Sequence, residues 1–489
     1  MAGWARGRIL MGEEEKAKRG WQARWRALRD RDHTRGSLFA SMLVLALPMV
    51  LGSLAAGVVY PLVDLSFLVS LGEDSLASVV IVNQTVWQIV IMGFMGMNFA
   101  TQSHVSRWVG AARPDEAEHV AGQALLLAGA IGVVVGLCGL LLPEWLLRVS
   151  GADPVFFPIA LPYMQWLFLL ASGFGGGFVF RAILTGAGDT TMPLVVSLVQ
   201  VSVSLAAEWI FIFGHLGAPE LGVRGVALGM GLGQFTAGGL GLAILFRGKA
   251  RVRLRVRHLV PDPVALRSLL ASAWPPALQM IGMIASSFFY LRLAGGFGPE
   301  VQTAYTIGLR LGMIVPQFSF PLATACATLV GQALGAGDRG RAWRAMGAGV
   351  VVHGGLLWCF AAGLFLFRQQ ILELVSSDPA VIAVGTEYLG FTSAGYVLMG
   401  VAMVLMRALQ GAGDFVVPMA ISLGSTFLVN LPAAWFLSTH TDLGSTGIWA
   451  GGLLGGIVNL LVTVGWVATG RWARRVQRLP GEEEPGTAE

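Results

Sequence analysis

The sequence has little charge and almost no cysteine for its length. Charged residues make up 12% of the 489 positions, apolar residues 55%, and the mean hydropathy is +0.69. A water-soluble chain of this size needs far more charge to cover its surface. The three cysteines, Cys138, Cys326 and Cys359, lie inside apolar runs without metal-ligand or disulfide spacing. This favours buried apolar side chains over a metal or redox role.

Long apolar runs recur from one end of the chain to the other, and each is long enough to cross a bilayer as a helix. A membrane β-barrel would show short alternating segments instead. The sequence therefore predicts an all-α polytopic membrane protein. We expect twelve transmembrane helices, over residues 43–71, 77–101, 119–142, 157–183, 192–214, 223–246, 266–294, 301–330, 345–367, 380–406, 416–438 and 445–470.

Positive charge is distributed unevenly about these spans. Of the 33 Lys and Arg, 28 fall in the N-terminal tail, the even-numbered loops and the C-terminus, Arg181 and Arg407 among them. Four fall in the odd-numbered loops, and Arg310 is left inside a span. The positive-inside rule then predicts cytoplasmic termini on a multi-pass protein of the cell (inner) membrane. Because the basic residues flank spans, they do not indicate nucleic-acid binding.

The first 36 residues contain basic residues and tryptophan but no apolar core, so they are not a cleavable signal peptide. We expect a cytoplasmic tail, either lying on the membrane surface or solvated.

The chain contains an internal duplication. RAILTGAGDTTMP (Arg181–Pro193) and RALQGAGDFVVP (Arg407–Pro418) share an ordered pattern about 225 residues apart, and LGVRG at Leu221 is repeated as LGSTG at Leu443. Six spans per half imply parallel repeats with a cavity between two bundles. Each GAGD is interpreted as a turn followed by a helix cap, because no Lys-Ser/Thr follows it to make a phosphate-binding loop. The predicted domains are an N-terminal tail (1–36), an N-lobe (37–247), a basic linker (248–265), a C-lobe (266–470) and a C-terminal tail (471–489).

The linker contains the run RGKARVRLRVRH, which we interpret as a topology anchor, with contact to anionic lipid as the alternative.

Asp64 is the one carboxylate in the first span, and Pro61 loosens the helix just before it. Glu208 lies in the fifth span. Counted from the span ends at about 1.5 Å per residue, both acids lie about 10 Å below the outer surface. Two interpretations remain open at this point: the acids share one proton-binding site, or each separately reaches the interface or bonds a neighbouring helix.

Neutral polar residues in the same half are weaker candidates. They either line a substrate cavity or hydrogen-bond between helices, with the second favoured for Tyr163, Gln165 and Gln200. Pro48 and Pro61 are the candidate hinge residues. The substrate-cavity candidates are Tyr60, Asn83, Gln84, Gln88, Asn98 and Gln200.

Several motifs together resemble the multidrug and toxic compound extrusion (MATE) family, closest to its DinF-like branch. They are Pro48 opening the first span, YPLVD ending at Asp64, SRWVGA at Ser106, the two GAGD joints, LGVRG at Leu221 and LVGQALGAGD at Leu329. The resemblance covers nearly everything but the tails. It implies two six-helix lobes in a V, and a secondary active antiporter that exports organic cations and other amphipathic compounds in exchange for inward H⁺ or Na⁺.

The resemblance also implies roles for particular residues. Asp64 matches the first-helix carboxylate of the family. The DinF-like branch places a second acid in the fifth helix, four residues after an Asn; here the stretch SLAAE supplies Glu208 and Ser204 instead. The C-lobe acids of NorM-like members have no counterpart in this chain. The expected cation-coupling residues are therefore Asp64, Glu208 and Ser204, all in the N-lobe.

Two rival functions are weighed against drug export. A lipid-linked saccharide flippase would favour a strongly cationic cavity, and Arg310 is the one basic residue assigned within a span. An integral-membrane enzyme would need clustered His, Asp or Glu, which the sequence does not show. We therefore expect no enzyme activity, no metal and no cofactor other than the coupling H⁺ or Na⁺. The expected partners are a small-molecule substrate and the lipid bilayer, and the expected state is a monomer.

Overall fold

The computed structural model describes residues 36–473 except residue 249, and over this range it contains helices and no strands. Eleven helices are long and apolar enough to cross a membrane, and there are twelve spans if two helices bent by 47° at Leu170 are counted as one. The predicted all-α polytopic fold is confirmed. The predicted tails lie outside the described residues, apart from Gly36 and Arg471–Ala473.

The first bundle consists of α2 (Leu38–Leu54), η1 (Ala55–Val59), α3 (Tyr60–Ser70), α4 (Glu73–Val82), η2 (Asn83–Trp87), α5 (Gln88–Gly110), α6 (Pro114–Leu141), α7 (Pro143–Val149), η3 (Pro154–Phe156), α8 (Phe157–Leu169), α9 (Ala171–Ala187), α10 (Thr191–Phe213), η4 (His215–Gly217) and α11 (Val223–Phe246). A segment with a short turn, η5 (Val256–Leu259), leads to the second bundle. That bundle consists of α12 (Pro263–Gly295), α13 (Pro299–Gly312), α14 (Val315–Gly335), α15 (Arg339–Gly349), η6 (Val350–Gly354), α16 (Gly355–Leu366), α17 (Arg368–Glu373), α18 (Pro379–Gly411), α19 (Val416–Gly424), η7 (Ser425–Asn430), α20 (Leu431–Thr439), α21 (Ser445–Ala468) and η8 (Arg471–Ala473).

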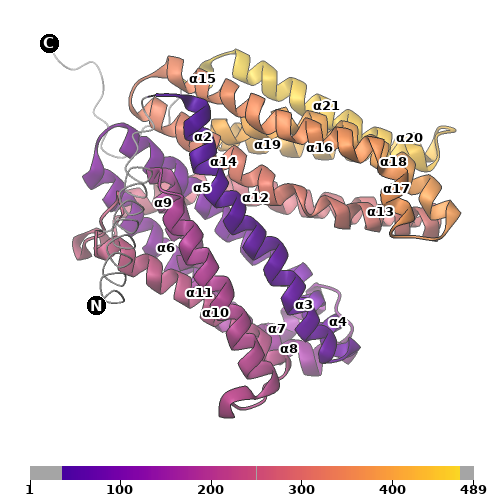
Figure 1. Ribbon diagram of the computed structural model, residues 1–489, viewed down its shortest axis with the longest axis horizontal. Coiled ribbons are helices and arrows are strands. Elements are labelled where there is room, and N and C mark those ends of the chain that lie inside the picture. The colour runs from indigo at the N-terminus through magenta and orange to yellow at the C-terminus, as the bar shows by residue number, and fades with distance from the viewer. Residues whose placement is uncertain (1–35, 249, 474–489) are drawn as a thin grey trace, which may run out of the picture.

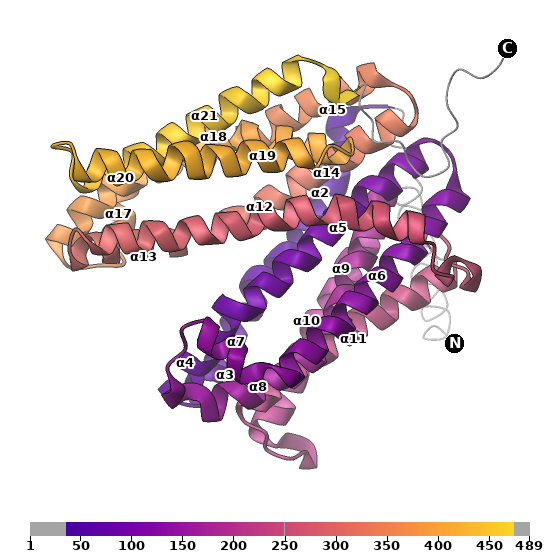
Figure 2. The same ribbon diagram turned by 180° about the vertical axis from the view of Figure 1, so that it is seen from behind.

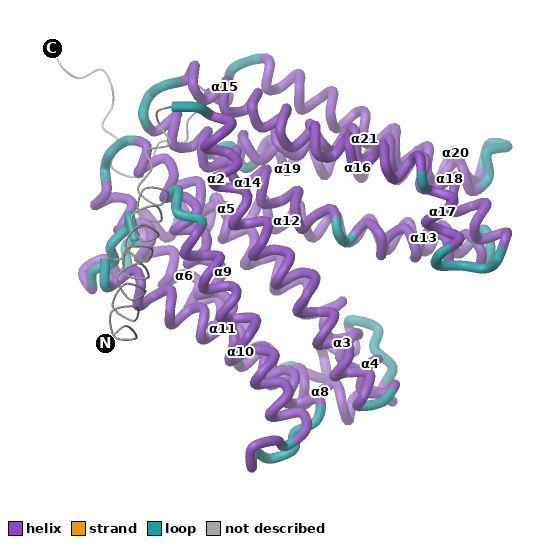
Figure 3. Tube along the Cα trace, in the orientation of Figure 1, coloured by secondary structure: helices purple, strands orange, loops and turns teal. Residues whose placement is uncertain are grey.

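The two bundles form a V (Figures 1 and 2). They meet where α5, α12 and α14 cross, and they diverge toward α3, α4 and α8 on one arm and α13, α17 and α20 on the other. The loops that join the helices are short (Figure 3). Within each arm, apolar side chains from neighbouring helices form the core, as expected for a membrane bundle.

At the closed end of the V, the first half of one helix from each bundle packs in the core of the other bundle. Met42 and Leu45, from the first half of α2, are buried in the core of the second bundle beside Leu322 of α14. In return, Leu269 and Ala273, from the first half of α12, are buried in the core of the first bundle. This reciprocal exchange joins the bundles through two continuous helices.

The helix formed by α2 and α3 contains an irregular turn next to Pro61. Residues Ala55–Val59 form a π-helical turn, and the Tyr60 N–H bonds to the carbonyl of Ala55, five residues back. Proline has no N–H to offer the regular ladder, which accounts for a local change in pairing. The counterpart helix α12 also carries prolines, Pro275 and Pro276, yet it remains α-helical throughout.

The two GAGD joints adopt the predicted turn and cap. Gly188 and Gly413 have φ angles of +87° and +89°, which favour glycine. The carboxylates of Asp189 and Asp414 accept hydrogen bonds from backbone N–H groups two or three residues later, at the start of the next helix.

Candidate functional site

Glu208 is completely buried in the first bundle, on α10. The hydroxyl of Tyr60 donates a hydrogen bond of 2.6 Å to its carboxylate. Tyr60 is the first residue of α3, directly after the π-helical turn. The irregular segment of the first span is therefore bonded to the acid of the fifth span.

Helix α11 covers the opposite side of Glu208 because it carries glycines there. A Cβ atom added to Gly229 would lie 2.4 Å from the Cγ atom of Glu208, and one added to Gly233 would lie 1.9 Å from the hydroxyl of Ser204. Only glycine lets the backbones of α10 and α11 approach this closely. The close approach packs Glu208 and Ser204 directly against helix backbone.

Asp64 follows Tyr60 by four residues, so both project from the same face of α3. Tyr60 bonds Glu208 and lies one helical turn from Asp64, so the two acids flank the same tyrosine. The Oδ1 atom of Asp64 and the Oε2 atom of Glu208 are buried without a hydrogen-bond partner among the described residues. Two partly unsatisfied carboxyl groups in a low-dielectric bundle are costly as anions, and a bound proton or cation relieves that cost.

A cavity of about 690 Å³ opens beside these acids. Most of its wall belongs to the first bundle, and α14 of the second bundle supplies Gln317 and Thr324. Neither Asp64 nor Glu208 lines the cavity, whereas Tyr60 does, so Tyr60 separates Glu208 from the cavity. The other predicted residues that line it are Pro48, Pro61, Gln88, Asn98, Gln200 and Ser204.

Two residues predicted for the cavity lie away from its wall. Asn83 accepts a hydrogen bond of 3.0 Å from the hydroxyl of Tyr163 on α8, so it links two helices. Gln84 is exposed on the π-helical turn η2. The extra residue in that turn shifts the helical phase, so the spacing that groups Asn83, Gln84 and Gln88 on one face does not hold.

Arg181 is the cavity residue that the sequence missed. It lies near the middle of α9 and is the single charged side chain among the described residues that line the cavity. Its Nη1 atom donates a 2.9 Å hydrogen bond to Gln200, and its guanidinium lies 5.0 Å from the ring centre of Phe178. Arg310, by contrast, is exposed in a separate hollow on α13. The assignment of Arg181 to a loop, and of Arg310 as the one intramembrane cation, is corrected accordingly.

Arg407, the repeat counterpart of Arg181, lies between the bundles rather than in a loop. It is 4% exposed, and its Nη2 atom donates a 2.8 Å hydrogen bond to Gln102 on α5. Its guanidinium lies 3.6 Å from the ring centre of Phe99. Arg407 therefore bonds one bundle to the other where they meet.

The GAGD joints also contribute to this seam. The Gly186 carbonyl accepts a 3.0 Å hydrogen bond from Gln332 of the second bundle, and the Gly411 carbonyl accepts a 3.1 Å bond from Ser103 of the first. Within the first bundle, a Cβ atom on Gly186 would lie 2.7 Å from the carbonyl oxygen of Gln102, so α9 also packs closely on α5. The motif thus packs the two bundles together as well as turning the chain.

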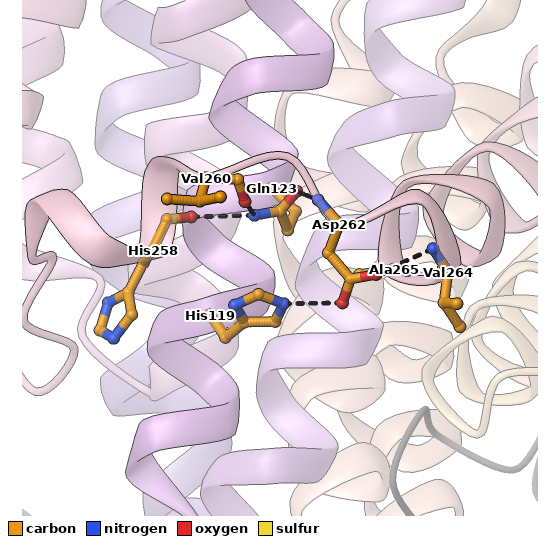
Figure 4. Close-up of polar contacts among 7 residues, drawn as sticks. All are labelled: His119, Gln123, His258, Val260, Asp262, Val264 and Ala265. Carbon is orange, nitrogen blue, oxygen red and sulfur yellow. Dashed lines mark hydrogen bonds and ion pairs between the residues drawn. The ribbon is translucent and has the colours of Figure 1, made fainter.

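The basic segment between the bundles is held against α6 by hydrogen bonds (Figure 4). The Gln123 amide donates to the carbonyls of His258 and Val260, at 2.9 and 2.7 Å, and accepts from the N–H of Asp262. Asp262 caps α12 and pairs with His119 at 3.1 Å. This segment is part of the packed structure of the first bundle.

Two helical bundles around a shared cavity, with buried acids beside it, define a polytopic membrane transporter. Comparison with known proteins agrees with this class. The MatE family model matches residues 48–210 and 275–436, about two thirds of the chain. The chain belongs to the MATE family of membrane transporters, and it is not an enzyme.

Individual relatives are distant but cover nearly the whole chain. The probable multidrug resistance protein NorM of Thermotoga maritima is 23% identical over 436 residues, which is 89% of this chain and 93% of that protein. The multidrug resistance protein PmpM of Pseudomonas aeruginosa is 26% identical over 454 residues, 90% of this chain and 94% of that protein. Among solved structures, a MOP superfamily transporter from Pyrococcus furiosus is 22% identical with a TM-score of 0.82, covering 91% of this chain and 98% of that one. Another, described as an outward-facing multidrug resistance MATE transporter, is 23% identical with a TM-score of 0.82, covering 90% and 97%.

Proposed function

We propose that this chain is a secondary active antiporter that exports amphipathic organic compounds, cationic ones among them, in exchange for inward H⁺ or Na⁺. The observation that carries the proposal is a pair of acids near a cavity of drug size: Glu208 is fully buried, and Asp64 is half-buried with a buried Oδ1 atom. Relatives named as multidrug resistance proteins support the cargo class. Because the relatives carry NorM names, the assignment of this chain to the DinF-like branch stays a prediction.

The coupling step follows from the cost of buried charge. A proton that enters the acid pair removes a negative charge from a low-dielectric bundle. Tyr60 links that change to the cavity wall, because its hydroxyl bonds Glu208 while its ring faces the cavity. The π-helical turn and Pro61 place the bendable part of the first span at the same level. Proton uptake from outside weakens the hold on a cationic cargo, which leaves outward, so the proton and the cargo occupy the protein alternately as the bundles rock about the closed end of the V.

We also propose the orientation from charge. Helix α15, whose first turns carry Arg339, Arg341 and Arg344, lies at the end where the bundles meet, so this end faces the cytoplasm under the positive-inside rule. The V then opens outward. The inner-membrane location, the cytoplasmic termini, the monomeric state and the lobe boundaries at 37–247 and 266–470 belong to the same proposal.

The flippase alternative is weaker. Recognition of a polyanionic saccharide-lipid headgroup needs several cations, and the described cavity wall carries one, Arg181. A single guanidinium among amides and aromatic rings suits a smaller amphipathic cargo.

The test uses the full-length protein in sealed vesicles with a fluorescent organic cation inside. An inward H⁺ gradient is expected to drive its efflux, and Asp64→Asn is expected to reduce this efflux to the passive leak while the protein still inserts. A parallel Na⁺ gradient identifies the coupling ion. Undiminished efflux by Asp64→Asn would show that Asp64 takes no part in the coupling step. Absence of efflux under both gradients would contradict the antiporter proposal.

A further inference from the structure

The segment that joins the bundles has one face in the protein core and one face exposed. Val252 and Leu254 are each 1% exposed and belong to the core of the first bundle, whereas Arg253 and Arg255, which alternate with them, are exposed. Such alternation is typical of an extended chain, and Arg255 has extended φ and ψ angles of −122° and 153°. The two arginines therefore project from the same side, about 7 Å apart along the backbone.

Backbone hydrogen bonds hold both arginines in place without using their side chains. The N–H of Arg253 donates a 3.1 Å hydrogen bond to Glu118 of α6, and the N–H of Arg255 donates to the ring of His258 at 3.4 Å. Neither guanidinium forms an ion pair with another described residue, whereas that of Arg257 pairs with an aspartate of α6 at 3.0 Å. The segment thus presents two unpaired positive charges on a fixed backbone.

Exposed apolar side chains follow the two arginines along the chain. Val256 is 75% exposed, and Val260 and Val264 are each 65% exposed. Val264 begins a stripe of exposed apolar residues on one side of α12 that continues with Leu270 and Trp274. None of these five residues lines the cavity between the bundles. Basic and apolar side chains on one surface, continuous with an apolar helix face, suit the boundary between lipid headgroups and acyl chains.

We propose that Arg253, Arg255, Val256 and Val260 form a binding surface for an anionic phospholipid, called here the linker surface. The lipid phosphate accepts hydrogen bonds from the two guanidinium groups, and the valines contact the glycerol and the upper acyl chains. A soluble anion matches the arginines but leaves the valines exposed to water, so a lipid accounts for both halves of the surface. The linker surface precedes α12 at the end where the bundles meet, which the proposed orientation assigns to the cytoplasmic leaflet. Lipid binding here does not depend on the proposed exchange of cargo for ions.

The experiment uses the full-length protein in neutral detergent. Phosphatidylglycerol or phosphatidylcholine with identical acyl chains is titrated in, and the first bound lipid is measured by native mass spectrometry. We expect the wild type to bind phosphatidylglycerol at least about tenfold more tightly, because each basic residue near an anionic lipid contributes about fivefold. Arg253→Gln/Arg255→Gln is expected to reduce this preference to less than about twofold. The control, Arg224→Gln/Arg292→Gln, removes the same charge from exposed positions at the far ends of α11 and α12 and is expected to keep the preference.

Equal binding of the two lipids by the wild type overturns the proposal, and so does an equal loss of preference in the control. Arg253→Lys/Arg255→Lys keeps the charge and the backbone bonds, so it is expected to retain most of the preference; complete loss there contradicts a charge-based site. Val256→Ser/Val260→Ser is expected to weaken both lipids about fivefold or more, because apolar contact area is lost. Unchanged lipid binding in the serine variant, or displacement of phosphatidylglycerol by an equal concentration of glycerophosphoglycerol, would assign the surface to a soluble anion and contradict the lipid.

Discussion

The two bundles pack their helices in the same way but bury different side chains at corresponding positions. In the first, Gly229 and Gly233 of α11 pack on Glu208 and Ser204; in the second, Gly451 and Gly455 of α21 pack on Ala434 and Asn430. Glu208 therefore corresponds to Ala434, and Ser204 to Asn430. Each bundle also has a tyrosine bonded to one of these two positions, Tyr60 to Glu208 in the first and Tyr290 to Asn430 in the second. The duplicated scaffold is retained, but the acid is present in one copy.

The interior of the second bundle is filled instead by aromatic rings. Tyr305 stacks on Trp449 with ring centres 5.7 Å apart, and Tyr388 meets the same Trp449 edge-on at 4.6 Å. Such contacts stabilise a bundle without a buried charge. Under the proposed antiport mechanism, the comparison assigns ion coupling to the first bundle alone, with the second bundle as its partner.

The largest expected effect on efflux comes from removing Glu208, compared with removing a neutral polar side chain of the second bundle. Glu208→Ala is expected to lower ion-driven efflux at least about a hundredfold, to the passive leak, because the variant cannot hold the exchanged ion at this position. Asn430→Ala, which removes a polar side chain of the second bundle one turn before Ala434, is expected to keep efflux within about threefold of wild type. Efflux from sealed vesicles measures both. Comparable losses in the two variants would break the one-bundle model.

The glycine contacts allow a stability test of the same comparison. Gly229→Ala places a Cβ atom 2.4 Å from Glu208 Cγ, and Gly451→Ala places one 2.2 Å from the Ala434 nitrogen. Each is expected to destabilise the protein by about 1–3 kcal/mol through overpacking. Gly239→Ala, on α11 with nothing within 4 Å, is the matched control. Thermal unfolding in detergent measures stability.

Only Gly229→Ala is expected to lower efflux in addition, since it displaces the acid. If Gly451→Ala reduces efflux per folded molecule as strongly, the defect comes from helix packing and not from Glu208.

The sequence alone predicts that the two acids lie at one depth, because the rise of a helix is constant and the span ends carry clear turn residues. The sequence does not predict that Tyr60 links Glu208 to the cavity, because a single sequence carries no direct information on contacts between distant residues. The sequence pattern assigns Arg181 and Arg407 to loops, because each precedes a GAGD turn. The structure buries those turns between the bundles, so side chains near them face the cavity or the seam.

The sequence likewise does not predict the reciprocal packing of α2 and α12. Leu45 and Leu269 belong to ordinary apolar runs, and only the three-dimensional arrangement assigns each run to the opposite bundle.

A smaller effect is expected at the tyrosine bonds. Tyr60→Phe removes the hydroxyl that bonds Glu208 and is expected to lower ion-driven efflux about tenfold, because a hydrogen bond to an ionisable group is lost. Tyr290→Phe removes the tyrosine bond of the second bundle, to Asn430, and is expected to change efflux less than threefold. Equal effects in the two variants would mean that the tyrosines matter for packing and not for coupling.

The smallest effect concerns how each bundle holds its adjoining segment. In the first bundle, α6 holds the linker through Gln123 and through the pair of His119 with Asp262 (Figure 4). In the second bundle, Trp472 packs edge-on against Trp343 of α15 at 5.1 Å. The linker contact contains groups that titrate, whereas the tryptophan contact does not, so acid should loosen the first and spare the second.

The direction of the pH effect follows from two groups of the linker. Burial lowers the pKa of His258, so its neutral form stabilises docking, and that stability is lost as the pH falls below about 6.5. The hydrogen bond from His119 lowers the pKa of Asp262, whose contribution is present above about pH 4 and is lost as the pH falls through its folded value. Asp262 is partly exposed, so the total effect is expected to stay below about 1 kcal/mol.

Hydrogen exchange, corrected for the intrinsic rate at each pH, measures this contact directly. Between pH 7 and pH 5, protection of the backbone amides in η5 is expected to fall up to about fivefold, while the Trp472 indole keeps its protection. His258→Gln removes the titration of His258 and is expected to reduce the fall between pH 7 and pH 5. Uniform loosening of both segments would show that acid acts on the whole membrane protein, and the asymmetry between the two bundles would then not extend to their attachments.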